Sequence, residues 1–130
     1  MSNLILEMRQ GDMMVVNGAA IRFRAKTRIE LTARARFLFG RQIMPPDQAN
    51  SPARRIYYAL QAAYIGEPAE RAAGLETARQ RIEEFKRATT SPTAASLLDQ
   101  ALALANADNC YQALRLARRV MQHETAILHP

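Results

Sequence analysis

The spacing of apolar residues changes at a pair of prolines, Pro45 and Pro46. Before these prolines, short apolar stretches alternate with turn residues, a rhythm typical of antiparallel strands. After them, apolar residues recur three and four positions apart, as they do in amphipathic helices. The sequence therefore predicts an α+β fold, with an N-terminal antiparallel β-module of about five strands followed by about four α-helices.

Two turn signals organise the β-module, which we expect to form a β-meander. Gln10, Gly11 and Asp12 separate the first two apolar stretches. Asn17-Gly18 is the dipeptide best suited to a two-residue hairpin turn, because both positions of that turn need a positive φ. These signals predict strands over residues 4–6, 13–16 and 19–25, with further strands near 28–31 and 37–39.

Alternation along the strands predicts an apolar inner face and a basic outer face. The residues expected to point inward are Ile21, Phe23, Ile29, Leu31, Phe37 and Phe39. The five arginines expected to share the outer face are Arg22, Arg24, Arg28, Arg34 and Arg36. Such a strip suits the phosphates of a single strand or a stem-loop. The ordinary solvent face of a half-buried sheet also alternates in this way, so both interpretations stay open.

The segment Pro45-Pro46-Asp47 cannot continue a strand ladder and predicts a stiff, extended linker. Ser51 and Ser91 each precede a proline, which matches a capped helix start, and Glu67-Pro68 resembles these starts. A fourth helix is expected after Asp108. The predicted domains are a basic antiparallel β-module at residues 1–44, a proline-rich linker at 45–51 and a helical region at 52–130.

Net positive charge is confined to the first sixty residues, which hold ten basic and four acidic side chains. Residues 61–130 hold eight of each sign. Sixteen of the 18 basic residues are arginine, whose planar guanidinium stacks on bases and grips phosphate; a genome rich in G and C would give the same bias. A basic β-module beside a neutral helical region predicts one surface for a polyanion and another for a protein.

No pattern of reactive side chains indicates catalysis. His123 and His129 have no carboxylate or cysteine at ligand spacing, and Cys110 lies in an apolar pattern that predicts a buried, inert thiol. The glycines are scattered and form no phosphate-binding loop. We therefore expect no enzyme, no metal and no cofactor. Because long apolar runs and a signal-peptide pattern are absent, we also expect a cytoplasmic protein that makes no membrane contact.

An uncommon segment joins a Pro-Asp-Gln linker to a Ser-Pro-Ala-Arg-Arg-Ile-Tyr helix start at residues 46–57. Together with Ile43-Met44-Pro45, Tyr58 and Tyr64-Ile65-Gly66, this segment closely resembles the FlbT family of flagellar biosynthesis regulators. The resemblance extends across nearly the whole chain, through residues 11–12 and 16–19 upstream and residues 111–114 with Arg118 downstream. It implies a post-transcriptional regulator that binds the 5′ untranslated leader of flagellin mRNA, often in concert with the protein FlaF.

The start of the chain carries a second resemblance, through Leu4-Ile5-Leu6, Arg9, Gly11-Asp12 and Asn17-Gly18. These residues resemble the opening of CsrA, a small β-rich repressor of messenger RNA whose dimers exchange strands. Met8 stands where that family has the first of two adjacent arginines, so the RNA contacts of CsrA are not transferred. The resemblance implies a β-module able to form a homo-oligomer.

The candidate RNA-binding residues combine the arginine strip with the start of the first helix. They are Arg22, Arg24, Arg28, Arg34, Arg36, Arg41, Arg54, Arg55 and Tyr57. Guanidinium and phenol groups on one helical turn could stack on unpaired bases. Alternatively, Tyr57 or Tyr58 packs in the core while Arg54 or Arg55 binds Asp47 and fixes the linker.

We expect a non-enzymatic regulator that binds the 5′ untranslated leader of flagellin mRNA and represses its translation or promotes its decay. The alternative is a protein-interaction module or chaperone-like factor. Such a factor would bind flagellin or FlaF through its helices and would affect the message indirectly. The balanced charge and alanine-rich faces of the helical region leave this alternative open, beside simple packing of the helices on one another.

Overall fold

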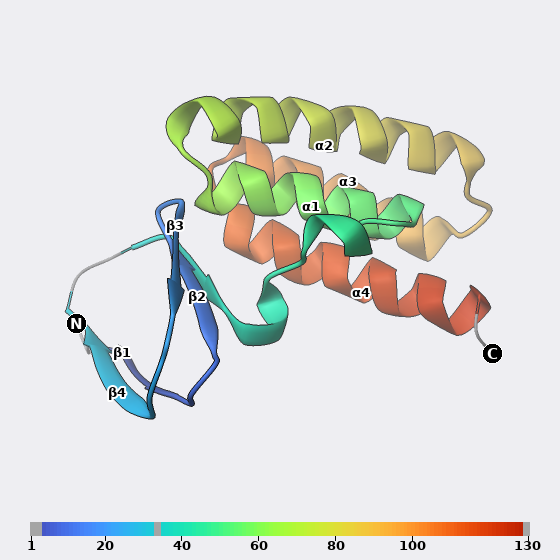
Figure 1. Cartoon of the computed structure of the whole chain (residues 1–130). Coiled ribbons are helices and arrows are strands. Elements are labelled where there is room, and N and C mark those ends of the chain that lie inside the picture. The colour runs from blue at the N-terminus through green and yellow to red at the C-terminus, as the bar shows by residue number, and fades with distance from the viewer. Residues whose placement is uncertain (1–3, 33–34, 129–130) are drawn as a thin grey trace. The chain divides into compact units, whose positions relative to one another are not determined.

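The computed structural model describes residues 4–32 and 35–128 (Figure 1). The chain divides into two compact units, Met1–Ile43 and Met44–Pro130. The described part of the first unit contains β1 (Leu4–Met8), β2 (Met13–Val16), β3 (Ala19–Arg22), β4 (Thr27–Leu31), β5 (Phe37–Phe39) and a 3₁₀ helix at Gly40–Gln42. That of the second contains a 3₁₀ helix at Pro46–Gln48, α1 (Pro52–Ile65), α2 (Pro68–Ala88), α3 (Pro92–Asn106) and α4 (Cys110–Leu128). The predicted α+β class is confirmed.

Strands β1 to β4 form one long hairpin that turns at Asn17 and Gly18. The φ angles of these residues are 49° and 86°, both positive, as a tight two-residue turn requires. Next to the turn, β2 pairs antiparallel with β3. Farther out, β1 pairs antiparallel with β4. The predicted hairpin turn is therefore confirmed.

A β-bulge at Gly11 interrupts the hairpin between its two ladders. The Asp12 amide donates to the Arg9 carbonyl (3.1 Å), which closes a tight turn around Gly11. The Gly11 amide donates to the Phe23 carbonyl (2.7 Å), whereas the Phe23 amide donates to the Asp12 carbonyl (2.9 Å). Two residues of one strand thus face one residue of the other, and the first of the two is a glycine with φ of 90°.

The strand order corrects the predicted meander. One sheet has the order β3-β2-β5, and β1 and β4 form a separate two-stranded sheet. In a meander, β1 would pair with β2 and β3 with β4. The turn between Arg9 and Asp12 bends the chain without reversing it, so β1 continues along the hairpin and meets β4 instead.

Burial follows the predicted alternation in β4, where Ile29 and Leu31 are half-buried and Arg28 and Glu30 are exposed. The expectation for Ile21 is wrong, since this side chain is 40% exposed. β3 is an edge strand and every one of its four residues is exposed. Edge strands lack a neighbour on one side, so alternation there does not ensure burial.

The expectation for β5 is also wrong. Leu38, and not its neighbours, is the buried residue of this strand. Phe37 and Phe39 are half-buried, and their rings stack on each other with centroids 6.3 Å apart. Leu38 lies opposite the half-buried Val15 of β2, whereas Phe39 lies opposite the buried Met14, so both faces of β5 are partly covered.

Three of the helices begin as predicted, with a proline in the first turn. The Ser51 hydroxyl accepts from the Arg54 amide (3.3 Å), and the Ser91 hydroxyl accepts from the Ala94 amide (3.2 Å). Glu67 precedes Pro68 at the start of α2. Proline is favoured at this position because its missing N–H would have no partner in the first turn.

The proline segment is not the extended linker that was predicted, because Pro46–Gln48 form a short 3₁₀ helix. Its start is tied to α1 by Gln61, whose side chain is buried. The Gln61 amide nitrogen donates to the Met44 carbonyl (3.0 Å), and its oxygen accepts from the Met44 amide (2.7 Å). Both polar groups of this buried amide are therefore satisfied by one backbone residue.

The helical unit is built around α1, which packs on α2 and α4, while α3 packs on α4. Gly74 is a point of close approach between α2 and α1. A Cβ atom at this position would lie 2.7 Å from the Ala63 nitrogen and 2.8 Å from the Ala59 oxygen. Only glycine lets the two backbones come this close.

Candidate RNA-binding surface

Five exposed cations surround the break in the hairpin. We name them the hairpin-break cluster: Arg9, Arg22, Arg24, Lys26 and Arg28. Met8 and Thr27 form the last pair of the β1–β4 ladder. Arg9 follows Met8 and Lys26 precedes Thr27, so both cations lie at the same end of that ladder. The backbone geometry of the break therefore brings cations from both sides of the hairpin together.

Two further members belong to the β3 side of the break. Arg22 is opposite Met13 at the end of the β2–β3 ladder. Arg24 follows Phe23, whose amide and carbonyl are both bonded to the bulge. The strand pairing and the bulge thus fix the backbone next to each of these arginines, although their side chains stand in solvent.

Acidic groups near the cluster are few. Arg28 lies opposite Glu7 in the ladder and shares its face of β4 with Glu30. The Asp12 carboxylate accepts a hydrogen bond from the Arg9 amide (2.8 Å) and so stabilises the turn. Residues 1–43 hold eight basic and three acidic residues, a net charge of +5. Such an excess of positive charge on one small unit attracts polyanions.

The prediction that the five arginines share one face of a sheet is wrong. Arg22 belongs to the β3-β2-β5 sheet and Arg28 to the β1–β4 sheet. Arg24 lies in the bend between them. The cause is the break itself, which ends one ladder before the next begins.

The remaining arginines of the β-module lie apart from the cluster. Arg34 lies outside the described residues. Arg36 is half-buried, and its backbone exchanges hydrogen bonds with Asn17 at the hairpin turn. Arg41 is exposed in the 3₁₀ helix after β5.

The candidates on α1 have different environments. Tyr57 is buried, so its ring packs in the helical unit and offers no face to a base. Burial raises the pKa of the Tyr57 phenol, and the charge of Arg118 partly offsets this effect. Arg54 is half-buried and donates to the Gln48 carbonyl (3.5 Å), whereas Arg55 is exposed.

Arg9 and Lys26 belong to the cluster but not to the RNA-binding residues predicted from the sequence. The signal was present, because counting outward from the Asn17-Gly18 turn places Arg9 opposite Lys26 in an uninterrupted hairpin. The predicted meander pairs β1 with β2, so it does not place Arg9 opposite Lys26.

Cations of the helical unit more often have acidic partners. Arg79 forms ion pairs with Glu76 and Glu83 along α2, and its hydrogen bond lowers the pKa of Glu76. Lys86 of α2 binds Asp99 of α3 at 2.6 Å. These surface pairs leave little excess charge for a polyanion.

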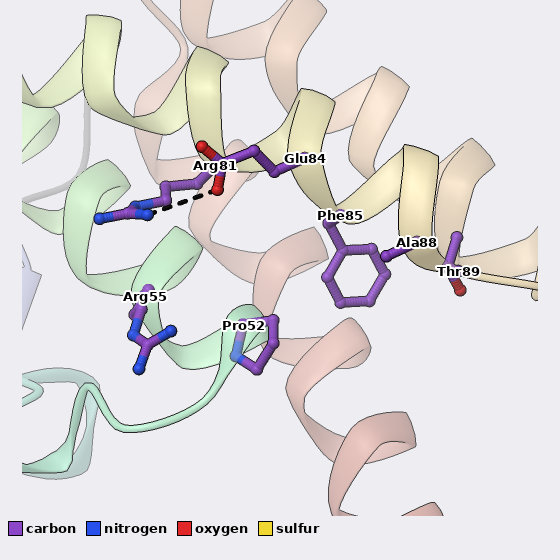
Figure 2. Close-up of a pocket in the computed structure, with 7 residues that line it drawn as sticks. All are labelled: Pro52, Arg55, Arg81, Glu84, Phe85, Ala88 and Thr89. Atoms are coloured by element: carbon purple, nitrogen blue, oxygen red, sulfur yellow. Dashed lines mark hydrogen bonds and ion pairs between the residues drawn. The ribbon is translucent and has the colours of Figure 1, made fainter.

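A pocket of about 340 Å³ opens between the start of α1 and the end of α2 (Figure 2). Its apolar part is formed by Pro52, Phe85 and Ala88. Arg55 and Arg81 stand at one side of it in Figure 2, and Arg81 reaches Glu84 at 3.4 Å. An apolar wall thus adjoins two guanidinium groups, one of which is paired with Glu84.

Within the described ranges, no group of three or more histidine, cysteine, aspartate or glutamate side chains is arranged to hold a metal ion. In the same ranges, no helix has the length and apolar character needed to span a bilayer. Cys110 is buried, as its apolar surroundings in the sequence predict.

Comparisons with known proteins match this chain over nearly its full length. The family model described as "Flagellar protein FlbT" matches residues 4–128. The flagellum biosynthesis repressor protein FlbT of Caulobacter vibrioides is 30% identical over 125 residues, which cover 93% of this chain and 86% of that protein. A probable flagellum biosynthesis repressor protein FlbT of Mesorhizobium japonicum is 28% identical over 134 residues, covering 98% and 86%. No solved structure gives a significant match.

Proposed function

Because the chain belongs to the FlbT family, we propose that it represses flagellum biosynthesis by binding the 5′ untranslated leader of flagellin mRNA through the hairpin-break cluster. Bound there, the protein hinders translation of the message or promotes its decay. Repression is the activity given in the names of its relatives. Binding to RNA is supported by the charge of the β-module.

The observation that carries this proposal is the hairpin-break cluster. Its five side chains are exposed, and their backbone is positioned by two strand ladders and a bulge. Guanidinium groups bind phosphate in two-pronged geometry and stack on unpaired bases. The cluster thus provides both the charge and the donor geometry that a single-stranded leader needs.

Salt dependence gives a quantitative expectation. Each phosphate of a single strand that is neutralised contributes about −0.7 to the slope of log affinity against log salt concentration. If all members of the cluster contact phosphate, the slope is about −3.5. Reversing the charge of two members reduces it to about −2, because about three phosphate contacts then remain.

The test is a titration of labelled flagellin leader RNA, and of a scrambled RNA of equal length, by fluorescence anisotropy at several salt concentrations. The variant Arg24→Glu with Lys26→Glu changes two bend residues outside the ladders. Its matched control is Arg115→Glu with Arg119→Glu, which reverses two exposed charges on α4. We expect selective binding of the leader that the first variant loses and the control retains. Absence of leader binding, or equal loss in both variants, would contradict the proposal.

A second candidate function is supported by the pocket on the helical unit. Its apolar wall and the nearby Arg55 and Arg81 fit a partner segment that carries an apolar side chain next to a carboxylate. In this alternative, the protein binds FlaF or flagellin and acts on the message indirectly. Binding of purified FlaF or flagellin that is abolished by Arg55→Ala with Arg81→Ala, but unaffected by Arg24→Glu with Lys26→Glu, would favour it.

A further inference from the structure

The sheet formed by β1 and β4 is incomplete. It has two strands. In the described chain, β1 and β4 contact each other far more extensively than either strand contacts any other element. An isolated two-stranded ribbon is only marginally stable in water, whereas three or more strands with an apolar face are stable. Among the described residues no third strand pairs with the outer edge of β1 or β4, so the backbone groups on these edges can pair with a further strand.

Apolar side chains of this sheet remain in contact with solvent. Leu4 is 45% exposed and Ile5 is 49% exposed. Leu6, Ile29 and Leu31 are half-buried. The strand register places Leu6 opposite Ile29 and Leu4 opposite Leu31, so these four side chains share one face of the sheet. Met8 belongs to the same face and is buried, so the exposed part of the face lies toward Leu4.

The sequence of β4 is complementary to itself. Its five residues are Thr27, Arg28, Ile29, Glu30 and Leu31. When two such strands run antiparallel with Ile29 opposite Ile29, each Arg28 lies opposite Glu30 of the other strand. Opposite charges in directly facing positions stabilise a strand pair.

We propose that β4 pairs antiparallel with β4 of a second copy of this chain, around a two-fold axis at Ile29. The product is a four-stranded sheet in the order β1-β4-β4-β1. Leu6 and Ile29 of both copies then form one apolar row across its inner face. On the outer face, Arg28 lies between Glu7 of its own chain and Glu30 of the second copy. The interface is isologous, as closed dimers of identical subunits require.

The edge of β1 is a poorer candidate for the same contact. Antiparallel pairing of two β1 strands around Leu6 would place Glu7 opposite Ile5. A carboxylate would then face an exposed isoleucine and find no cation there. Charge complementarity therefore favours β4 as the shared edge.

The dimer also determines where the basic residues lie. The hairpin break adjoins Thr27, at the start of β4. In an antiparallel pair, the two breaks lie at opposite ends of the shared strands. The proposal does not depend on RNA binding, and it can be tested on protein that is free of nucleic acid.

The test measures the association state of the full chain by sedimentation velocity over a wide range of concentrations. Arg28→Glu places glutamate opposite Glu30, and Glu30→Arg places arginine opposite Arg28. Each variant alone therefore brings like charges together at two symmetric positions. We expect its dimer dissociation constant to rise by about tenfold or more, because like charges directly opposite one another are destabilising.

Complementation separates this interface from any other. A mixture of the two single variants places glutamate opposite arginine at both positions, so we expect a heterodimer with affinity close to that of the wild type. The double variant, R28E with E30R, should again form a homodimer. Arg115→Glu on α4 is the control, and circular dichroism verifies that every variant is folded.

Two outcomes would overturn the proposal. The first is a wild-type chain that stays monomeric at all concentrations. The second is a dimer whose affinity is unchanged by the single charge reversals, since its interface must then lie elsewhere. Five residues per strand make a small contact, so the dimer is expected to be reversible rather than obligate.

Discussion

Glu124 of α4 caps the start of α1, more than 70 residues away in the sequence. Its carboxylate accepts a hydrogen bond from the Ser51 hydroxyl and another from the Ala53 amide, the latter at 3.0 Å. The free amides at a helix start carry partial positive charge, so a carboxylate placed there is favoured by the helix dipole as well. We predict that Glu124→Ala destabilises the helical unit.

The magnitude follows from these contacts. A hydrogen bond to a charged group contributes about 1.5–3 kcal/mol when buried. Glu124 is half-buried, so water compensates for part of the loss. Ser51 still accepts from the Arg54 amide in the variant, which preserves part of the cap. We therefore expect the free energy of unfolding to fall by about 2 kcal/mol, within the range measured for lost helix caps.

The assay is urea denaturation followed by far-ultraviolet circular dichroism. Glu124→Gln should lose less than Glu124→Ala, because its amide oxygen can still accept one hydrogen bond. Glu83→Gln is the control, since it removes an exposed carboxylate whose pairing with Arg79 is a surface ion pair and contributes little to stability. A Glu124→Ala variant within about 0.5 kcal/mol of the wild type would refute the role of this contact as a cap.

Two further predictions concern the core of the helical unit. Gly74→Ala should destabilise the helical unit by about 2 kcal/mol in thermal unfolding, because the alanine Cβ would overlap the α1 backbone. This loss should outweigh the better helix propensity of alanine. A variant more stable than the wild type would show that α1 and α2 lie farther apart. Burial raises the pKa of Tyr57 in the folded state above its ordinary value of 10, so the unfolded chain loses the phenol proton at a lower pH than the folded chain does. The free energy of unfolding should therefore keep the full contribution of Tyr57 below about pH 10 and fall as the pH rises further. In Tyr57→Phe, the free energy of unfolding should decrease less with rising pH, as measured by urea denaturation at a series of alkaline pH values. An unchanged decrease would show that another group causes it.

Local signals determined much of the fold. Asn17-Gly18 specifies a tight turn because few dipeptides tolerate two positive φ angles. Ser51-Pro52 and Ser91-Pro92 specify helix starts because cap and proline act within one turn. Each of these features depends on residues close together in the chain, so the sequence alone was sufficient to predict them.

The candidate site was only partly predictable. The excess of arginine before residue 60 is visible in the sequence, and so is the exposure of alternate residues in β4. Alternation could not determine that Arg22 and Arg28 belong to different sheets, since it gives the face of a side chain within one strand and not the partner of that strand. Tyr57 was equally undecided, because a helical aromatic can face either the core or the solvent.

What the sequence determined by itself is the order of strands and helices, their main boundaries, and the confinement of net positive charge to the N-terminal part of the chain. Tertiary structure alone decided that Gln61 binds Met44 and that Glu124 caps α1. The physical reason is distance along the chain. Turns and caps arise from neighbouring residues, whereas these contacts join residues far apart, whose pairing depends on how the whole unit packs.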